Sequence, residues 1–140
     1  MGWLAMMLAA ALPLSQAALP LDELPPQVMA KNSCALFLWD RASARRVEMM
    51  VAVPGPAYVR VARGGTVVAL PQISAEGDPV LGFAPRAKFG DAAMTLAFDL
   101  TVVANDGAVG GGIVRDGVMT VTGADGVAVV APVAGLVGCN

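Results

Sequence analysis

Short apolar segments separated by turn signals constrain the fold of this 140-residue chain more than any other feature. The clearest segment spans residues 94–102, where every second side chain is large and apolar. These positions are Met94, Leu96, Phe98, Leu100 and Val102, and the residues between them are Thr95, Ala97, Asp99 and Thr101. A period of two residues is typical of a half-buried antiparallel strand, whereas a helix repeats every three or four residues. The pattern therefore predicts a strand.

Similar runs fill most of the chain between residues 35 and 139. We expect further strands at 35–39, 47–53, 58–62, 66–70, 80–83, 108–114, 118–122 and 126–133, with 134–139 closing the chain. Hairpin signals are expected at Gly64-Gly65, Asp116-Gly117 and Asp125-Gly126, a turn at Asn105-Asp106-Gly107 and a loop at 71–79. Residues 85–91 fit no single pattern. About eight strands in meander order predict an all-β domain, a small antiparallel barrel or sandwich, and we favour the barrel.

The amino terminus reads as a secretory signal peptide. Residues 1–14 are apolar and uncharged, and small residues follow up to Ala17 and Ala18, although no Lys or Arg precedes the apolar run. We expect cleavage after Ala17 or Ala18, a Pro-rich arm at 18–33 and a β-domain at 34–140. The run is shorter than the roughly 20 residues of a membrane-spanning helix, so the mature chain should be periplasmic or secreted and not integral to a membrane. An N-terminal anchor or a buried helix remains the alternative.

The two cysteines, Cys34 and Cys139, bracket the proposed domain. In an oxidising compartment the simplest state of two cysteines is one disulfide, which here would tie the first strand to the chain end. Two buried free thiols are the alternative.

Composition removes several classes of function. The chain has no His, which excludes Ser-His-Asp and Cys-His catalysts, and its net charge of −2 gives no reason to expect nucleic-acid binding. Gly110-Gly111-Gly112 lacks the lysine of a phosphate loop, and the Asp-Gly turns lack calcium-site spacing. Glu76 and Asp78 sit two apart in a turn, as in a solvated loop. We therefore expect no enzyme, cofactor or metal. An enzyme that uses only Arg, Asp and Tyr is the remaining catalytic alternative.

One basic cluster is a candidate binding site. Arg41, Arg45 and Arg46 fall within six residues, and Arg60 could join them if neighbouring strands pair. Such a patch could bind an unknown protein or an anionic envelope component through guanidinium hydrogen bonds. The alternative is an ordinary solvated loop.

The layout is similar in outline to small periplasmic lysozyme inhibitors of the MliC type. A cysteine begins the first strand, another is the penultimate residue, and Gly82-Phe83-Ala84-Pro85-Arg86 lies roughly where that family has a Ser-Gly-x-x-Tyr loop. The resemblance implies an exported, disulfide-bonded, eight-stranded fold that presents a loop to lysozyme. The Ser and Tyr are missing here, so no inhibitory residue is carried over.

Two hypotheses on function follow. The first is an exported, non-enzymatic β-domain that binds a protein or envelope partner. The second is a carrier of a small apolar ligand with a lipocalin-like barrel interior, since strands such as 127–133 are apolar on both faces.

Overall fold

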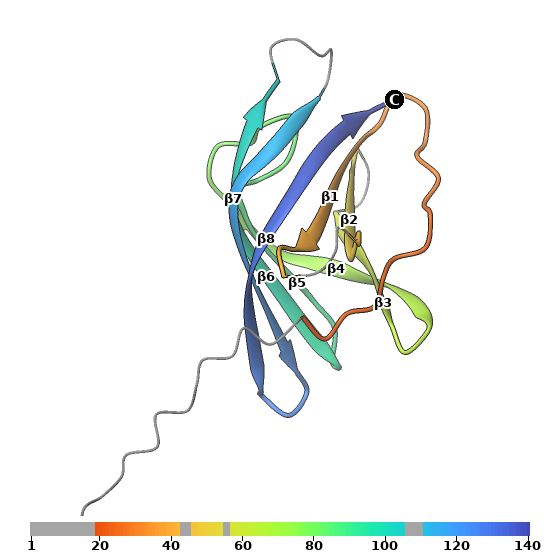
Figure 1. Ribbon diagram of the computed structural model, residues 1–140, viewed down its shortest axis with the longest axis vertical. Helices are drawn as coiled ribbons and strands as arrows, with labels where there is room; N and C mark the ends of the chain where they lie inside the picture. The colour runs from red at the N-terminus through yellow and green to blue at the C-terminus, as the bar shows by residue number, and fades with distance from the viewer. Residues whose placement is uncertain (1–18, 43–45, 55–56, 106–110) are drawn as a thin grey trace, which may run out of the picture.

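The computed structural model describes residues 19–42, 46–54, 57–105 and 111–140, which form a closed barrel of eight antiparallel strands (Figure 1). The strands are β1 (Cys34–Asp40), β2 (Met49–Val53), β3 (Tyr58–Arg63), β4 (Thr66–Glu76), β5 (Arg86–Gly90), β6 (Met94–Ala104), β7 (Gly112–Gly123) and β8 (Ala128–Cys139). Each strand pairs with the next, and β8 pairs with β1. The all-β prediction is confirmed, and the fold is the barrel and not the sandwich.

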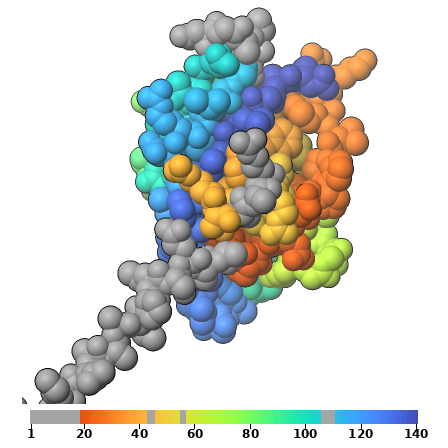
Figure 2. Space-filling model, viewed as in Figure 1, coloured from red at the N-terminus to blue at the C-terminus, as the bar shows by residue number. Residues whose placement is uncertain are grey.

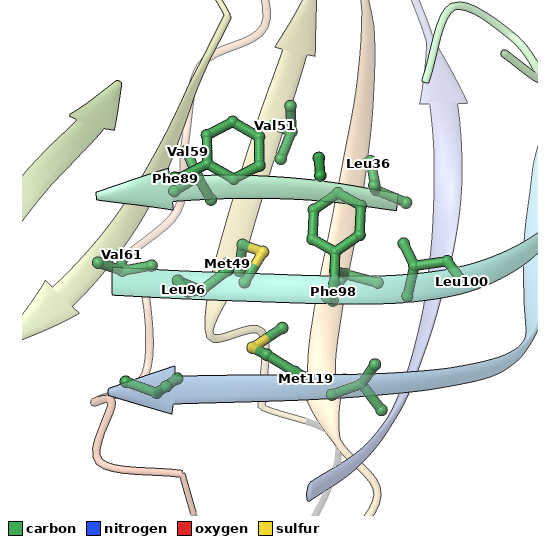
Figure 3. Close-up of a cluster of buried hydrophobic side chains, with 14 of the residues drawn as sticks. Leu36, Met49, Val51, Val59, Val61, Phe89, Leu96, Phe98, Leu100 and Met119 are labelled. Carbon is green, nitrogen blue, oxygen red and sulfur yellow. The ribbon is translucent and has the colours of Figure 1, made fainter. Parts of the chain in front are cut away.

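The barrel interior is packed with apolar side chains. On β6 the predicted inward residues Met94, Leu96, Phe98, Leu100 and Val102 are buried, while Asp99 and Thr101 are exposed. Figure 3 shows the rings of Phe89 and Phe98 among aliphatic and methionine side chains from several strands, and the two ring centroids are 5.8 Å apart. Close packing of this kind makes burial of apolar area the main stabilising contribution.

The pairing of β1 with β8 closes the barrel. Seven residue pairs run from Cys34 opposite Cys139 to Asp40 opposite Val133. The predicted disulfide is present between Cys34 and Cys139, whose Cα atoms are 4.0 Å apart. It closes a loop with a sequence separation of 105 residues. Loop-entropy arguments assign such a bond about 4–5 kcal/mol of stability.

The arm that precedes β1 packs on the outside of the barrel. It runs from the end near the β7–β8 turn to the opposite end, where the C-terminus lies (Figures 1 and 2). The backbone N–H groups of Asp22 and Leu24 donate to the carbonyls of Ala62 and Val47, at 2.9 and 2.7 Å. The arm is therefore a second layer over β1–β3 and not a detached linker.

Leucines of the arm enter two apolar clusters. Leu19 and Leu21 join the main core, and Leu24 packs with Ala35, Met50 and Ala62 on the outer face of β1–β3. This second cluster explains why β1 is apolar on both faces: one face lines the barrel and the arm covers the other.

The predicted loop at 71–79 is wrong in its first part. β4 continues to Glu76, with Pro71 opposite Tyr58. Proline lacks an N–H donor, but this part of the strand is exposed and its register shifts between Gln72 and Ser74. An irregular strand of this kind tolerates proline.

The predicted hairpin at Asp116-Gly117 is also wrong. β7 runs unbroken through both residues, and its register with β8 shifts between Val114 and Val118. A Cβ at Gly117 would lie 2.7 Å from the Leu100 side chain, so the glycine permits close packing at a bulge. The expected strand at 126–133 and the closing segment at 134–139 form one strand, β8, which begins at Ala128.

The remaining sequence predictions mostly place strands and turns at their observed positions. The strand expected at 80–83 is wrong, because these residues form a tight turn with a single bridge. Residues 86–90, which fitted no single pattern, form β5, and the hairpins at 64–65 and 125–126 are present. The turn at 105–107 and the first part of the predicted strand at 108–114 lie largely outside the described residues.

Gly135 offers a test of the β1–β8 seam. A Cβ at this position would collide with the backbone oxygen of Phe37 and lie 2.6 Å from Leu38 Cδ2. We expect Gly135→Ala to lower the free energy of unfolding by about 1–3 kcal/mol, because the backbone can yield only by shifting the seam. Urea unfolding followed by tryptophan fluorescence measures the change.

Gly138→Ala is the matched control on the same strand, because a Cβ there meets no atom within 4 Å. We expect its stability to stay within about 0.5 kcal/mol of the wild type. Equal effects of the two substitutions would contradict the steric argument.

Candidate functional site

The structure describes three of the four arginines of the predicted patch. Arg41 and Arg46 are exposed on either side of residues 43–45, so Arg45 lies outside the described residues. Arg60 lies within the sheet opposite Met50. Arg41 and Arg46 therefore lie at the connection between β1 and β2, whereas Arg60 makes a different contact.

Arg60 holds the arm against β3. Its guanidinium donates to Gln27 Oε1 at 3.3 Å and to the Tyr58 hydroxyl at 3.0 Å, and it lies 5.4 Å from the centre of the Tyr58 ring. Gln27 is 33 residues away in sequence, so the strand pattern alone could not indicate this contact.

A groove lies between the arm and the outer face of the sheet. It encloses about 250 Å³ and is lined by Glu23, Leu24, Pro25, Pro26, Gln27, Phe37 and Val47. Five of these seven residues are apolar, and the exposed Arg46, which is not among them, immediately precedes Val47 in the chain. An apolar depression beside a cation suits a partner with an apolar anchor next to an acidic group.

A second cavity of about 250 Å³ opens into the other end of the barrel. Its walls include Val51 and Val53 of β2 and the rings of Phe83, Phe89 and Phe98. Gln72 and Ala75 pair with Phe89 and Ala87, which face the interior, yet both are exposed. The second half of β4 therefore leaves the interior accessible at this end.

The segment 82–86, which invites comparison with an inhibitor loop, follows a tight turn. Leu81 and Gly82 have φ values of 53° and 86°, and the N–H groups of Val80 and Phe83 each donate to the other residue's carbonyl at 3.0 Å. Phe83 is 3% exposed and belongs to the core. The turn thus forms part of the wall of the end cavity, and its aromatic side chain is not presented to solvent.

Two carboxylates that the sequence did not single out are buried at the end of the barrel where the arm begins. Asp40 is 0% and Glu48 is 2% exposed. Glu48 Oε2 accepts the backbone N–H of Asp40 at 2.8 Å, and Asp40 accepts the N–H groups of Leu19 at 3.2 Å and Ala42 at 2.8 Å. One feature of the sequence does indicate that Asp40 is buried: it continues the pattern in which every second side chain, Leu36 and Leu38 before it, faces the interior.

Burial raises the pKa of Glu48 above its ordinary value of 4.5. Loss of hydration is the main cause and the nearby Asp40 charge adds to it, whereas the hydrogen bond from the Asp40 N–H and the charge of Arg46 oppose it.

Glu76 pairs with Arg86 at 3.6 Å on the exposed outer face, where such pairs contribute little stability. Among the described residues, no three His, Cys, Asp or Glu side chains are grouped so that they could hold a metal ion. The same part of the chain contains no helix with the length and apolar character needed to cross a membrane.

Comparisons with models of protein families, with curated proteins and with solved structures found no match to this chain.

The pKa of Glu48 predicts a pH dependence of stability. Because the folded-state pKa is raised, the folded protein binds the proton more tightly than the unfolded chain does. The contribution of Glu48 to the free energy of unfolding is therefore fully present below pH 4.5. It is lost as the pH rises through the pKa of Glu48 in the folded protein. We expect Glu48→Gln to remove this fall while its amide oxygen still accepts the Asp40 N–H. Urea unfolding of both proteins between acidic and neutral pH measures the difference.

Distant carboxylates such as Asp91, whose pKa is lowered by the N–H groups of Ala93 and Met94, titrate in both proteins. Their effect on stability therefore cancels when the wild type is compared with the variant. Parallel pH profiles for wild type and Glu48→Gln would contradict the prediction.

Proposed function

We propose that the protein is an exported, non-enzymatic barrel that binds a protein partner at its outer surface. The proposed site combines the groove between the arm and β1–β2 with Arg41 and Arg46 of the β1–β2 connection. The Cys34–Cys139 disulfide is consistent with an oxidising compartment, as export requires.

The observation that supports surface binding most directly is the groove itself. Pro25, Pro26, Phe37 and Val47 give it apolar walls, and the exposed Arg46 is adjacent to Val47 in the sequence. Apolar anchors in such depressions supply most of the binding energy in protein interfaces, and charges at the rim steer association. A packed mid-barrel core leaves the outside as the main area for contact.

The test compares capture of envelope proteins by the exported wild type and by a variant with Arg41, Arg45 and Arg46 changed to Ser. We expect at least one protein to be retained by the wild type and lost with the variant, since rim charges raise the rate of association. Quantitative mass spectrometry of the captured proteins gives the readout.

A second variant with Lys31, Lys88 and Arg115 changed to Ser removes the same charge at exposed positions outside the groove. This control should retain the partner. Equal recovery of every protein by both variants would rule out the arginine patch.

The end cavity favours a second candidate function, the binding of a small apolar ligand. Its aromatic and aliphatic walls and its exposed side at Gln72 and Ala75 provide an apolar site with access from solvent. At about 250 Å³ it would hold a small molecule and not a long lipid chain.

We expect the fluorescent apolar probe N-phenyl-1-naphthylamine to bind the wild type and Ala75→Phe to weaken binding about tenfold, because the new ring occupies the cavity. Ser74→Phe is the matched control: Ser74 pairs with the exposed Lys88, on the outer face, whereas Ala75 pairs with the buried Ala87. Probe titration by fluorescence measures both, and equal binding to the two variants would exclude the cavity.

A further inference from the structure

The first described residue is held inside the barrel end. Leu19 is 4% exposed and its side chain lies in the main core. Its backbone nitrogen is 3.2 Å from Asp40 Oδ2, a contact that joins residues 21 apart in sequence. The backbone nitrogen of a residue next to an expected processing site thus contacts a fully buried carboxylate.

We propose that the leader is removed after Ala18, and that the new α-ammonium group of Leu19 forms an ion pair with Asp40 at the barrel end. The inference rests on the proposed export of the chain. A leader peptidase would hydrolyse the Ala18–Leu19 bond with one water molecule. The carboxylate would leave with Ala18, and the amine of Leu19 would take up a proton.

The charge distribution around Leu19 favours this terminus. Asp40 and Glu48 are buried close together, since the Asp40 N–H donates to Glu48 Oε2 at 2.8 Å. Burial of carboxylates is costly unless charges or hydrogen bonds offset it. An amide N–H offers Asp40 a dipole, whereas an ammonium at the same atom offers a full positive charge and a stronger, charge-assisted hydrogen bond.

The geometry also distinguishes between the two cleavage positions. Cleavage after Ala17 would leave the nitrogen of Leu19 as an amide and place the charge on the preceding residue, whose Cα is about 3.8 Å further along the chain. Only cleavage after Ala18 puts the ammonium on the nitrogen that lies at 3.2 Å from Asp40 Oδ2.

The first test is the intact mass of the full-length chain after expression in an exporting host. We expect the mass of residues 19–140 with one disulfide. A product that begins at Ala18 would overturn this inference and leave the proposed export intact. A product that retains Met1 and two free thiols would overturn both.

The second test measures acylation of the α-amine in the exported protein by an N-hydroxysuccinimide ester, with peptide mass spectrometry as the readout. Lys31 and Lys88 are exposed and serve as internal references. We expect the α-amine to react at least about tenfold more slowly in the folded protein than in urea, since one unit of raised pKa lowers the free amine tenfold.

Asp40→Asn should restore reactivity, because the amide keeps the shape of the side chain and loses its charge. Asp22→Asn is the control on the arm: Asp22 is exposed and its carboxylate accepts the N–H of Gly65 at 3.2 Å. Restored labelling in the Asp40 variant alone supports the ion pair. Equal labelling of the α-amine in folded and unfolded wild type overturns the ion pair. Because this comparison needs no variant, the test holds even where Asp40→Asn fails to fold.

Discussion

The seam between β1 and β8 is the constraint on which the barrel depends. A meander of antiparallel strands has two free edges until its last strand reaches its first, and closure removes both edges. Seven register pairs make this closure, and the disulfide fixes the pair at its outer end. Gly135 permits the backbones to approach where a side chain would strike the carbonyl of Phe37. The interior can be packed only because this seam holds the first strand against the last.

Sequence periodicity predicted most strands because a closed barrel has one face against the core and one toward solvent. It could not separate a barrel from a sandwich, since both folds give the same alternation and differ only in whether β1 meets β8. Pro71 and Asp116-Gly117 misled the prediction because each is usual in turns. Here the first lies in an exposed, irregular part of β4 and the second at a bulge in β7. In both places, pairing with the neighbouring strands outweighs the local preference of these residues for turns.

The candidate sites were harder to predict because each joins segments distant in the chain. The arginine cluster is visible in the sequence, but the role of Arg60 depends on Gln27, and the groove depends on Pro25 packing near Phe37 and Val47. Asp40 looks like the first residue of a charged loop, yet it is fully buried. Its environment is set by the arm and by Glu48, which no local pattern relates to it.

The arm links the two proposals. Leu19 and Leu21 fix its beginning in the core, and Leu24 through Gln27 form one wall of the groove. An ion pair at Leu19 would hold the start of this segment, so processing of the chain and formation of the partner site would be coupled. The cavity at the other end has different support: Val53 in its wall is paired with Cys34, one half of the disulfide. Release of the arm should therefore affect the groove before the cavity, whereas reduction of the disulfide should act first on the cavity end.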